Sequence, residues 1–132
     1  MPNLSVVDIR VFAPAKNFEL SKAFYVALGW RVRWDGGTLV LMELGDHRFY
    51  LDDHYNKGWA ESFRFHVTVE DAQAWYEHIS SVLKTGNFEG ARVEAPKQEY
   101  YGALATYAFD PSGILLDFAQ WPAATPSASK SE

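Results

Sequence analysis

Hydrophobic and polar residues alternate along several short segments of the chain, which is the pattern of β-strands with one covered face. The last of these segments follows a turn sequence, Asp-Pro-Ser-Gly at 110–113. It places Leu116 and Phe118 on one face and Asp117 on the other. A lone carboxylate in an otherwise apolar strand faces either water or a binding site.

Two longer segments have apolar residues at helical spacing. The first predicts a helix from about Phe18 to Leu28, capped by Asn17, and the second predicts a helix that Asp71 caps and that ends near Leu83. The predicted strands cover residues 6–12, 30–34, 39–44, 47–52, 63–69, 91–95, 104–109 and 114–120. The order is strand, helix and three strands, and the same order then repeats, which indicates two βαβββ modules.

The length of 132 residues suits one domain with a substantial core, since 48% of the residues are hydrophobic and 16% are aromatic. We expect a single domain over residues 1–120. Module one covers about 5–52, a connector covers 53–62, and module two covers about 63–120. Residues 121–132 turn to Ala, Ser, Pro and Thr, so we expect a disordered tail there.

The composition also limits the partners. The net charge of −5 argues against nucleic acid, because there is no basic stripe to neutralise phosphates. The chain has no cysteine, so it can have neither disulfides nor thiolate chemistry. We see no signal-peptide pattern and no apolar run near the roughly 18 residues of a membrane span. We therefore expect a cytoplasmic protein that binds neither nucleic acid nor membrane.

Three segments resemble the vicinal oxygen chelate superfamily, which includes glyoxalases, extradiol dioxygenases and bleomycin-resistance proteins. They are FYVALGW at 24–30, FHVTVEDAQAWY at 65–76 and DPSGILLDFAQ at 110–120. The resemblance covers about residues 6–120. It implies an α+β fold in which two βαβββ modules form an open curled sheet cleft with helices outside, the glyoxalase/bleomycin-resistance fold.

The alternation of the strands agrees with this implied fold. The residues expected under the helices are Val7, Ile9, Val11, Phe65, Val67, Val69, Leu116 and Phe118. The residues expected to point into the cleft from the same strands are Asp8, Arg10, Arg64, His66, Thr68, Leu115 and Asp117. Polar groups on a concave face in front of an apolar face suit a ligand cleft.

The resemblance also implies positions for metal ligands, which in metal-dependent members are mostly His and Glu. Asp117 matches the last of these positions, whereas the family more often has Glu there. The other counterparts are Asp8 or Arg10 on the first strand, Tyr50 on the fourth and Arg64 on the fifth. An arginine would repel a cation, so we do not favour a metal cofactor.

Two alternatives stay open at these positions. His66 lies two residues beyond Arg64 on the same face, so a metal site of His66, Asp117 and Asp8 is conceivable with a shifted register. Asp117 could equally form an ion pair with Arg64 or Arg10, and His66 could be hydrogen-bonded to a neighbour. A carboxylate that faces an arginine should have a lowered pKa.

Aromatic residues on short strands and loops, together with the stretch EYYGAL at 99–104, resemble the bleomycin-resistance branch. That branch lacks the metal, dimerises, and holds a flat cationic drug at the subunit interface. We therefore expect a homodimer that binds a small aromatic or cationic ligand in the cleft or at the dimer interface. The predicted cleft residues are Asp8, Arg10, Tyr50, Arg64, His66, Asp117, Trp34, Trp59 and Tyr101. The alternative is a metal-dependent lyase or dioxygenase, and the sequence does not decide whether the protein is an enzyme.

Overall fold

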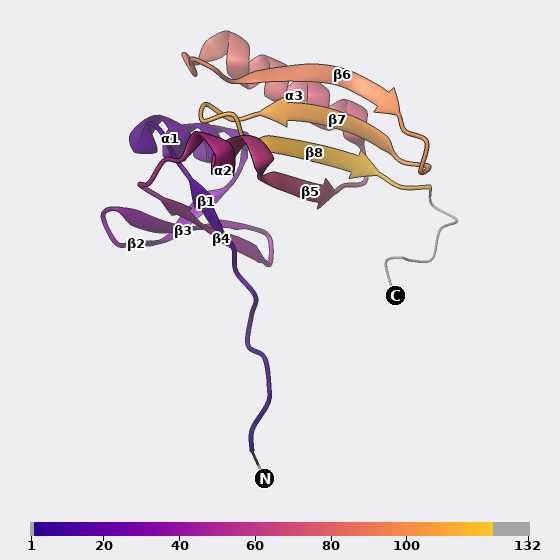
Figure 1. The fold of residues 1–132 in the computed structure, drawn as a ribbon. Coiled ribbons are helices and arrows are strands. Elements are labelled where there is room, and N and C mark those ends of the chain that lie inside the picture. Colours follow the sequence, from indigo (N-terminus) through magenta and orange to yellow (C-terminus); the bar gives the residue numbers. More distant parts are fainter. Residues whose placement is uncertain (1, 123–132) are drawn as a thin grey trace.

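The computed structural model describes residues 2–122 and contains two four-stranded sheets, each with a helix against one face (Figure 1). The first half consists of β1 (Phe12–Pro14), α1 (Phe18–Leu28), β2 (Arg31–Asp35), β3 (Leu39–Leu44) and β4 (His47–Asp52), followed by a connecting helix α2 (Lys57–Ser62). The second half consists of β5 (Arg64–Thr68), α3 (Ala72–Thr85), β6 (Arg92–Gln98), β7 (Leu104–Phe109) and β8 (Leu115–Gln120).

The two sheets have the same topology. The strand order is β1-β4-β3-β2 in the first sheet and β5-β8-β7-β6 in the second. In each, the first strand pairs in parallel with the last, and the other neighbours are antiparallel. The fold is therefore two βαβββ modules with open sheets, as the sequence predicts.

Local capping explains where the helices begin and end. The side chain of Asn17 accepts a hydrogen bond from the Leu20 amide at the start of α1, and Asp71 accepts one from the Ala74 amide at the start of α3. Gly29 ends α1 with a φ of 126°, a conformation that a residue with a side chain rarely adopts.

The Asp-Pro-Ser-Gly turn, between β7 and β8 of the second module, is hydrogen-bonded to α1 of the first module. Asp110 is fully buried, and its Oδ1 accepts hydrogen bonds from the Ser112 and Ile114 amides. The Tyr25 hydroxyl of α1 donates to Oδ2 over 2.7 Å. Burial raises the pKa of Asp110 to about 6, although the hydrogen bonds from Tyr25 and the turn act to lower it.

The core is aromatic and continues from one module into the other. Tyr25 packs edge-on against Phe49 of β4, and the ring centroids of Phe49 and Phe65 of β5 lie 4.7 Å apart. On the second sheet, Trp75 of α3 stacks on Phe118 of β8. The covered faces of both sheets thus share one hydrophobic core.

The predicted first strand is largely wrong. Only Phe12 of residues 6–12 belongs to β1, and residues 2–11, which we call the N-terminal arm, form no helix or strand. The beginning of the arm extends away from the domain (Figure 1). Val7 and Ile9, expected under a helix, are 97% and 81% exposed. The alternating pattern is present, but β4 pairs with β1 only over Phe12–Pro14, and a strand forms only where another strand accepts its backbone.

Three smaller differences concern loops and ends. The connector contains α2, which begins where the Asn56 side chain accepts a hydrogen bond from the Trp59 amide. Strand β6 extends three residues beyond the predicted end at Ala95 and has an irregularity between Glu94 and Lys97. Most of the predicted disordered tail, residues 123–132, lies outside the described residues. Between residues 2 and 122, no helix is long and apolar enough to cross a membrane.

Candidate functional site

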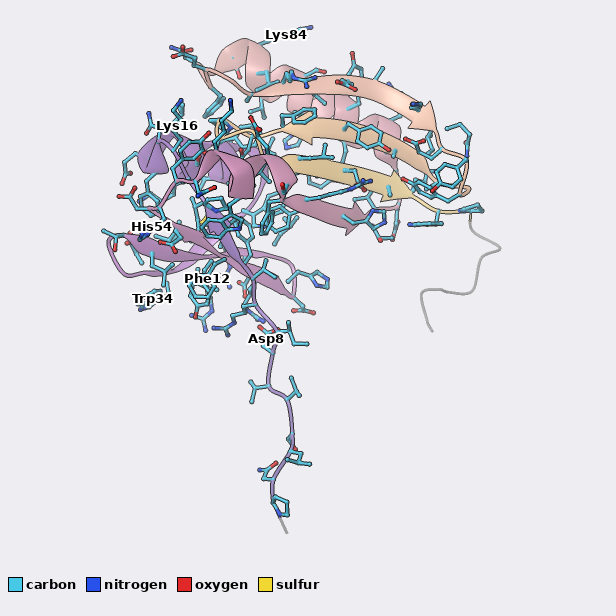
Figure 2. All side chains as sticks on the ribbon, viewed as in Figure 1. Asp8, Phe12, Lys16, Trp34, His54 and Lys84 are labelled. Carbon is cyan, nitrogen blue, oxygen red and sulfur yellow. The ribbon has the colours of Figure 1, made fainter. Side chains whose placement is uncertain are left out.

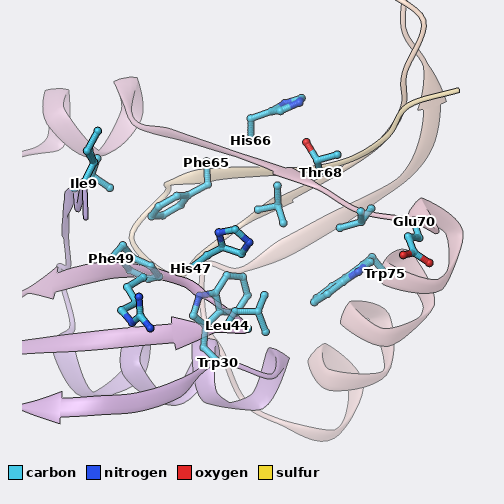
Figure 3. Close-up of a pocket in the computed structure, with 15 residues that line it drawn as sticks. Ile9, Trp30, Leu44, His47, Phe49, Phe65, His66, Thr68, Glu70 and Trp75 are labelled. Carbon is cyan, nitrogen blue, oxygen red and sulfur yellow. The ribbon is translucent and has the colours of Figure 1, made fainter. Parts of the chain in front are cut away.

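Each sheet has one face against its helix and one open face. On β5, Phe65 points into the interior with Phe49, whereas His66 and Thr68 point to the other side (Figure 3). On β8, Leu116 and Phe118 are in the core while Asp117 lies on the open side. The open faces are where the polar and aromatic residues singled out in the sequence gather.

Asp117 is the centre of the open face of the second sheet, and its side chain is fully buried. Arg64 donates from Nε to Oδ2 over 2.5 Å. His66 lies opposite Asp117 in the β5–β8 pairing, with Nδ1 2.5 Å from Oδ1, although the contact lacks the alignment of a hydrogen bond. The indole N–H of Trp121 donates to His66 Nε2 over 3.3 Å, which places the imidazole proton on Nδ1, toward Asp117.

This arrangement does not fit a divalent metal. The Arg64 guanidinium holds Oδ2 of Asp117, and its fixed positive charge would repel a cation that bound at the neighbouring Oδ1. Asp8, the third ligand of the alternative metal site with His66 and Asp117, instead contacts Arg10 and Arg48. Within residues 2–122, no group of three or more His, Cys, Asp or Glu side chains could hold a metal ion.

Aromatic side chains border the cluster that Asp117 forms with Arg64 and His66, which we call the Asp117 cluster. Tyr101 packs against Trp121, with ring centroids 5.4 Å apart, and both lie over a floor of small alanines. Tyr107 faces Asp117 from β7 and donates its hydroxyl to Glu99. Burial, and then the bond to Glu99, raise the pKa of Tyr107 well above its usual value, so this phenol stays protonated.

The open face of the first sheet contains a row of alternating charges. Glu43 of β3 is buried between Arg31 of β2 and Arg48 of β4, which are its neighbours in the strand pairing. Arg31 donates from Nε to Oε1 over 2.6 Å, and Arg48 from Nε to Oε2 over 2.7 Å. The hydrogen bond from Arg31 is the main cause that lowers the pKa of Glu43.

The arm adds a second charge pair beside this row. Arg10 donates from Nε to Asp8 Oδ2 over 3.0 Å and from Nη1 to the Tyr50 hydroxyl over 2.9 Å. Arg48 Nη1 lies 3.5 Å from the same Asp8 oxygen. The hydrogen bond from Arg10 lowers the pKa of Asp8, as expected for a carboxylate that faces an arginine.

An aromatic row crosses the same face next to the charges. Phe12 stacks on Tyr50 with ring centroids 4.9 Å apart, and Trp34 meets Tyr50 edge-on at 6.5 Å. Phe12 and Trp34 project from one side of the sheet, with Asp8 farther out on the arm (Figure 2). Trp34 is 51% exposed, so its ring offers an aromatic surface to a ligand.

The structure thus divides the predicted cleft residues into two groups and one outlier. One group gathers at the first sheet: Tyr50 and Trp34 on its strands, and Asp8 and Arg10 on the arm beside it. The other gathers at the second sheet: Arg64, His66 and Asp117 on its strands, and Tyr101 in the loop between β6 and β7, whereas Trp59 lies on α2. Among the described residues, no hydrogen bond or ion pair joins the two groups. Arg64 and His66, which the sequence left as alternatives, both contact Asp117.

Sequence reasoning missed several residues of these faces, among them Glu43, Tyr107 and Trp121. A signal existed for Glu43, because it is a lone carboxylate in the apolar strand Leu39–Leu44, as Asp117 is in its own strand. Nothing comparable marks Tyr107 or Trp121, which are aromatic residues among many others.

A groove of about 750 Å³ lies between the two sheets (Figure 3). It runs beside β5, which is an edge strand, and past the turn between β3 and β4. Its apolar lining includes Trp30, Leu44, Phe49, Phe65, Val67, Val69 and Trp75, with Ile9 and Val11 of the arm at one end. A groove of this chemistry suits an apolar segment of chain better than a charged ligand.

Solved structures with the same fold include proteins that bind antibiotics. A bleomycin-binding protein complexed with bleomycin has a TM-score of 0.73 and 22% identity, over 89% of this chain and 100% of that chain. An antibiotic-binding protein from a Streptomyces species has a TM-score of 0.71 and 19% identity, over 91% and 100%. A lactoylglutathione lyase from Agrobacterium tumefaciens has a TM-score of 0.61 and 16% identity, over 88% and 95%. At these identities the likeness shows the fold alone.

The sequence itself matches the profile of the Glyoxalase/Bleomycin resistance protein/Dioxygenase superfamily over residues 9–118. The chain therefore belongs to this superfamily, as its resemblance indicates. No curated protein sequence matches the chain. Membership gives the fold and a range of activities, so the activity has to be argued from the site.

Proposed function

We propose that this protein binds a small, flat aromatic ligand on its open sheet faces, that it catalyses no reaction, and that it uses no metal. The observation that carries this proposal is the pairing of Asp117 with Arg64. The guanidinium supplies the positive charge that a metal ion would bring to the buried carboxylate. A permanently charged side chain at that place favours binding over Lewis-acid chemistry.

Aromatic residues on both open faces support the choice of ligand. Trp34 on the first sheet, with Tyr50 edge-on to it, and Tyr101 and Trp121 beside the second sheet present ring surfaces on which a planar molecule can stack. The bleomycin-binding and antibiotic-binding proteins of the same fold support the same class of function. Their ligands do not transfer to this chain, because the identities are 22% and 19%.

A metal-dependent lyase or dioxygenase is the second candidate, because His66 and Asp117 do lie 2.5 Å apart. It requires a cation to bind Oδ1 of Asp117 beside the Arg64 guanidinium, and a further ligand to replace Asp8. Turnover of a glyoxalase-type or dioxygenase-type substrate that depends on an added divalent ion would establish this candidate and refute the first.

We also propose that the protein works as a homodimer. Leu4, Val6, Val7 and Ile9 of the arm are exposed apolar residues, an arrangement that is costly for a segment left in water. The groove beside the β5 edge is apolar and can take such a segment. The arm of a second copy would then cover the groove with a strand, which also pairs an open sheet edge. Cytoplasmic location, expected from the sequence, stays a prediction.

Binding can be tested by titrating the purified protein with naphthalene derivatives in excess EDTA and following tryptophan fluorescence. We expect saturable quenching that EDTA leaves unchanged. Replacement of Trp34 with Ala should weaken binding, whereas the matched control Trp59→Ala, on α2, should not. Binding that EDTA abolishes would contradict a metal-free site.

A further inference from the structure

The aromatic row of the first sheet is bordered on one side by arginines. In the strand pairing, Arg31, Glu43 and Arg48 lie side by side, and Trp34 and Tyr50 belong to the next row on the same face. The guanidinium of Arg10 also lies over this row, 5.7 Å from the centroid of the Tyr50 ring. A planar molecule stacked on Trp34, next to the perpendicular ring of Tyr50, would have one edge beside guanidinium groups.

Two carboxylates and three arginines form a charge cluster at this border: Glu43, Asp8, Arg31, Arg48 and Arg10. Every carboxylate oxygen of the cluster already accepts a hydrogen bond, whereas each arginine keeps an N–H donor without a partner among the described residues. Both oxygens of Glu43 accept from Arg31 and Arg48, and those of Asp8 accept from Arg10 and from the Ile9 amide. Within residues 2–122, Nη1 of Arg31, Nη2 of Arg48 and Nη2 of Arg10 have no hydrogen bond or ion pair. An arriving group at this border therefore meets unused N–H donors and no free acceptor.

The local charge has the opposite sign to the charge of the whole chain. Three guanidinium groups against two carboxylates leave one positive charge in the cluster, although the chain has a net charge of −5. The nearest carboxylate on the same face of β4 is Asp52, two residues beyond Tyr50 on the other side of the aromatic row. Asp52 itself has the imidazole of His54 3.5 Å away.

The surface of the row is also held in place. The Trp34 ring lies over Gly36, where an added Cβ would come within 2.3 Å of it. Tyr50 is held by Phe12 on one side and by the hydrogen bond from Arg10. Ring positions fixed before binding lower the cost of ordering the site around a ligand.

We infer that the first-sheet face selects flat aromatic acids: an aromatic ring carrying a carboxylate, sulfonate or phosphate. The ring stacks on Trp34 with the perpendicular Tyr50 ring beside it, and the anionic group takes the free donors of Arg48 and Arg10. This inference rests on the proposed function and narrows its ligand class from flat aromatic molecules to aromatic acids. The net negative charge of the chain, taken alone, would suggest a cationic ligand. Charge-assisted hydrogen bonds to guanidinium give an anion the advantage over a neutral isostere.

The test uses three ligands of nearly the same shape: naphthoate, naphthamide and a naphthyl trimethylammonium salt. Isothermal titration calorimetry at fixed ionic strength gives the dissociation constant of each. We expect naphthoate to bind about tenfold more tightly than naphthamide, a ratio at the low end for a hydrogen bond to a charged group, and the cation to bind most weakly. Equal affinities, or tightest binding of the cation, would overturn the inference and leave the proposed function intact.

Three variants locate the effect. Arg48→Gln should abolish the preference for naphthoate. If this variant folds poorly, the double variant Glu43→Gln/Arg48→Gln replaces it, because it leaves no buried carboxylate at position 43, and it should abolish the preference as well. Asp52→Asn, on the same face, should keep the preference. If Asp52→Asn removes it while Arg48→Gln does not, the inference is wrong.

The remaining outcomes also count against it. Failure of all three ligands to bind would refute the inference and the proposed function together. If a second copy of the chain covers this face, Trp34→Ala will change the oligomeric mass and not the affinity for naphthoate, and the inference is then wrong as well.

Discussion

Buried carboxylates on the two open faces are each paired with arginine side chains. Asp117 has Arg64, and Glu43 has Arg31 and Arg48. The charges are therefore compensated before any ligand arrives, and the donors left over on the arginines are what a ligand meets. Such donors can bind polar groups next to an aromatic surface without a metal.

Replacement of Arg64 with Met tests the pairing at Asp117. The change leaves a fully buried carboxylate without its arginine partner, so we expect the free energy of unfolding to fall by about 1–3 kcal/mol. Urea denaturation at one protein concentration measures the loss. The double variant Arg64→Met/Asp117→Leu should recover part of it. An unchanged midpoint for Arg64→Met would show that the pair does not contribute.

Asp110 is a different case, because its partners are a tyrosine hydroxyl and backbone amides. Its pKa is about 6 in the folded protein, against an ordinary value of 3.8. The folded state therefore holds this proton over a range of pH where the unfolded state has lost it. Stability conferred by the group is greatest below pH 3.8 and is lost as the pH rises to about 6.

This difference predicts a measurable pH dependence. Between pH 3.8 and about 6 the Asp110 carboxyl should lower the free energy of unfolding by about 3 kcal/mol as the pH rises. Asp110→Asn should remove that slope, because its amide can still bond to Tyr25 and accept from the turn. Urea denaturation of both proteins across this range gives the two slopes. Parallel slopes would contradict the account of Asp110.

At the scale of elements, strong local signals predict boundaries and weak ones do not. The predicted helix over residues 18–28 matches α1, because Asn17 and Gly29 mark both ends. The N-terminal arm has an equally clear alternation, but a strand depends on its neighbour, which the pattern does not contain. The capping signal of Asn56 for α2 is as good as that of Asn17, yet the helix is only six residues long and carries little periodicity.

The site was predictable to a similar extent. Alternation in the last strand singles out Asp117 and places it on the open face, where the structure has it. It could not choose between Arg64 and His66, since both lie on one face of β5, and both contact Asp117. The separation of the cleft residues into two groups depends on how the sheets are arranged, and no local pattern encodes that.

The hairpin between β2 and β3 positions Trp34, and Gly36 allows that position. In Gly36→Ala the new Cβ would meet the Trp34 ring at 2.3 Å and the Leu39 carbonyl oxygen at 2.9 Å, so the ring must move. We expect weaker binding of every naphthalene derivative, charged or neutral. Calorimetric titration measures the change, and Gly58→Ala, where the nearest atom is 3.4 Å away, is the matched control. Unaltered affinities would show that Trp34 is not part of the site.

At the scale of the whole molecule, one chain presents two separate open faces, an exposed apolar arm and an apolar groove. If the arm of a second copy fills the groove, the exposed apolar arm and the apolar groove cover each other. Such an exchange would bury apolar surface that is otherwise in water, at about 25 cal/mol for each Å². It would also bring additional residues close to the ligand faces.

Light scattering after size-exclusion chromatography tests this assembly. We expect a mass of twice the 15.0 kDa of one chain, and a lower mass for Val7→Asp/Ile9→Asp. Val26→Asp, at an exposed apolar position on α1, is the control and should leave the mass unchanged. A wild-type protein that stays at 15.0 kDa at every concentration would contradict the proposed dimer.

The metal content of the purified protein tests the central claim most directly. The protein, prepared without a histidine tag, is dialysed against trace divalent ions and then analysed by elemental mass spectrometry. We predict far less than one equivalent of any divalent metal per chain, because Arg64 holds the Asp117 carboxylate. Close to one equivalent, lost in Asp117→Ala, would contradict the account and favour the metal-dependent enzyme.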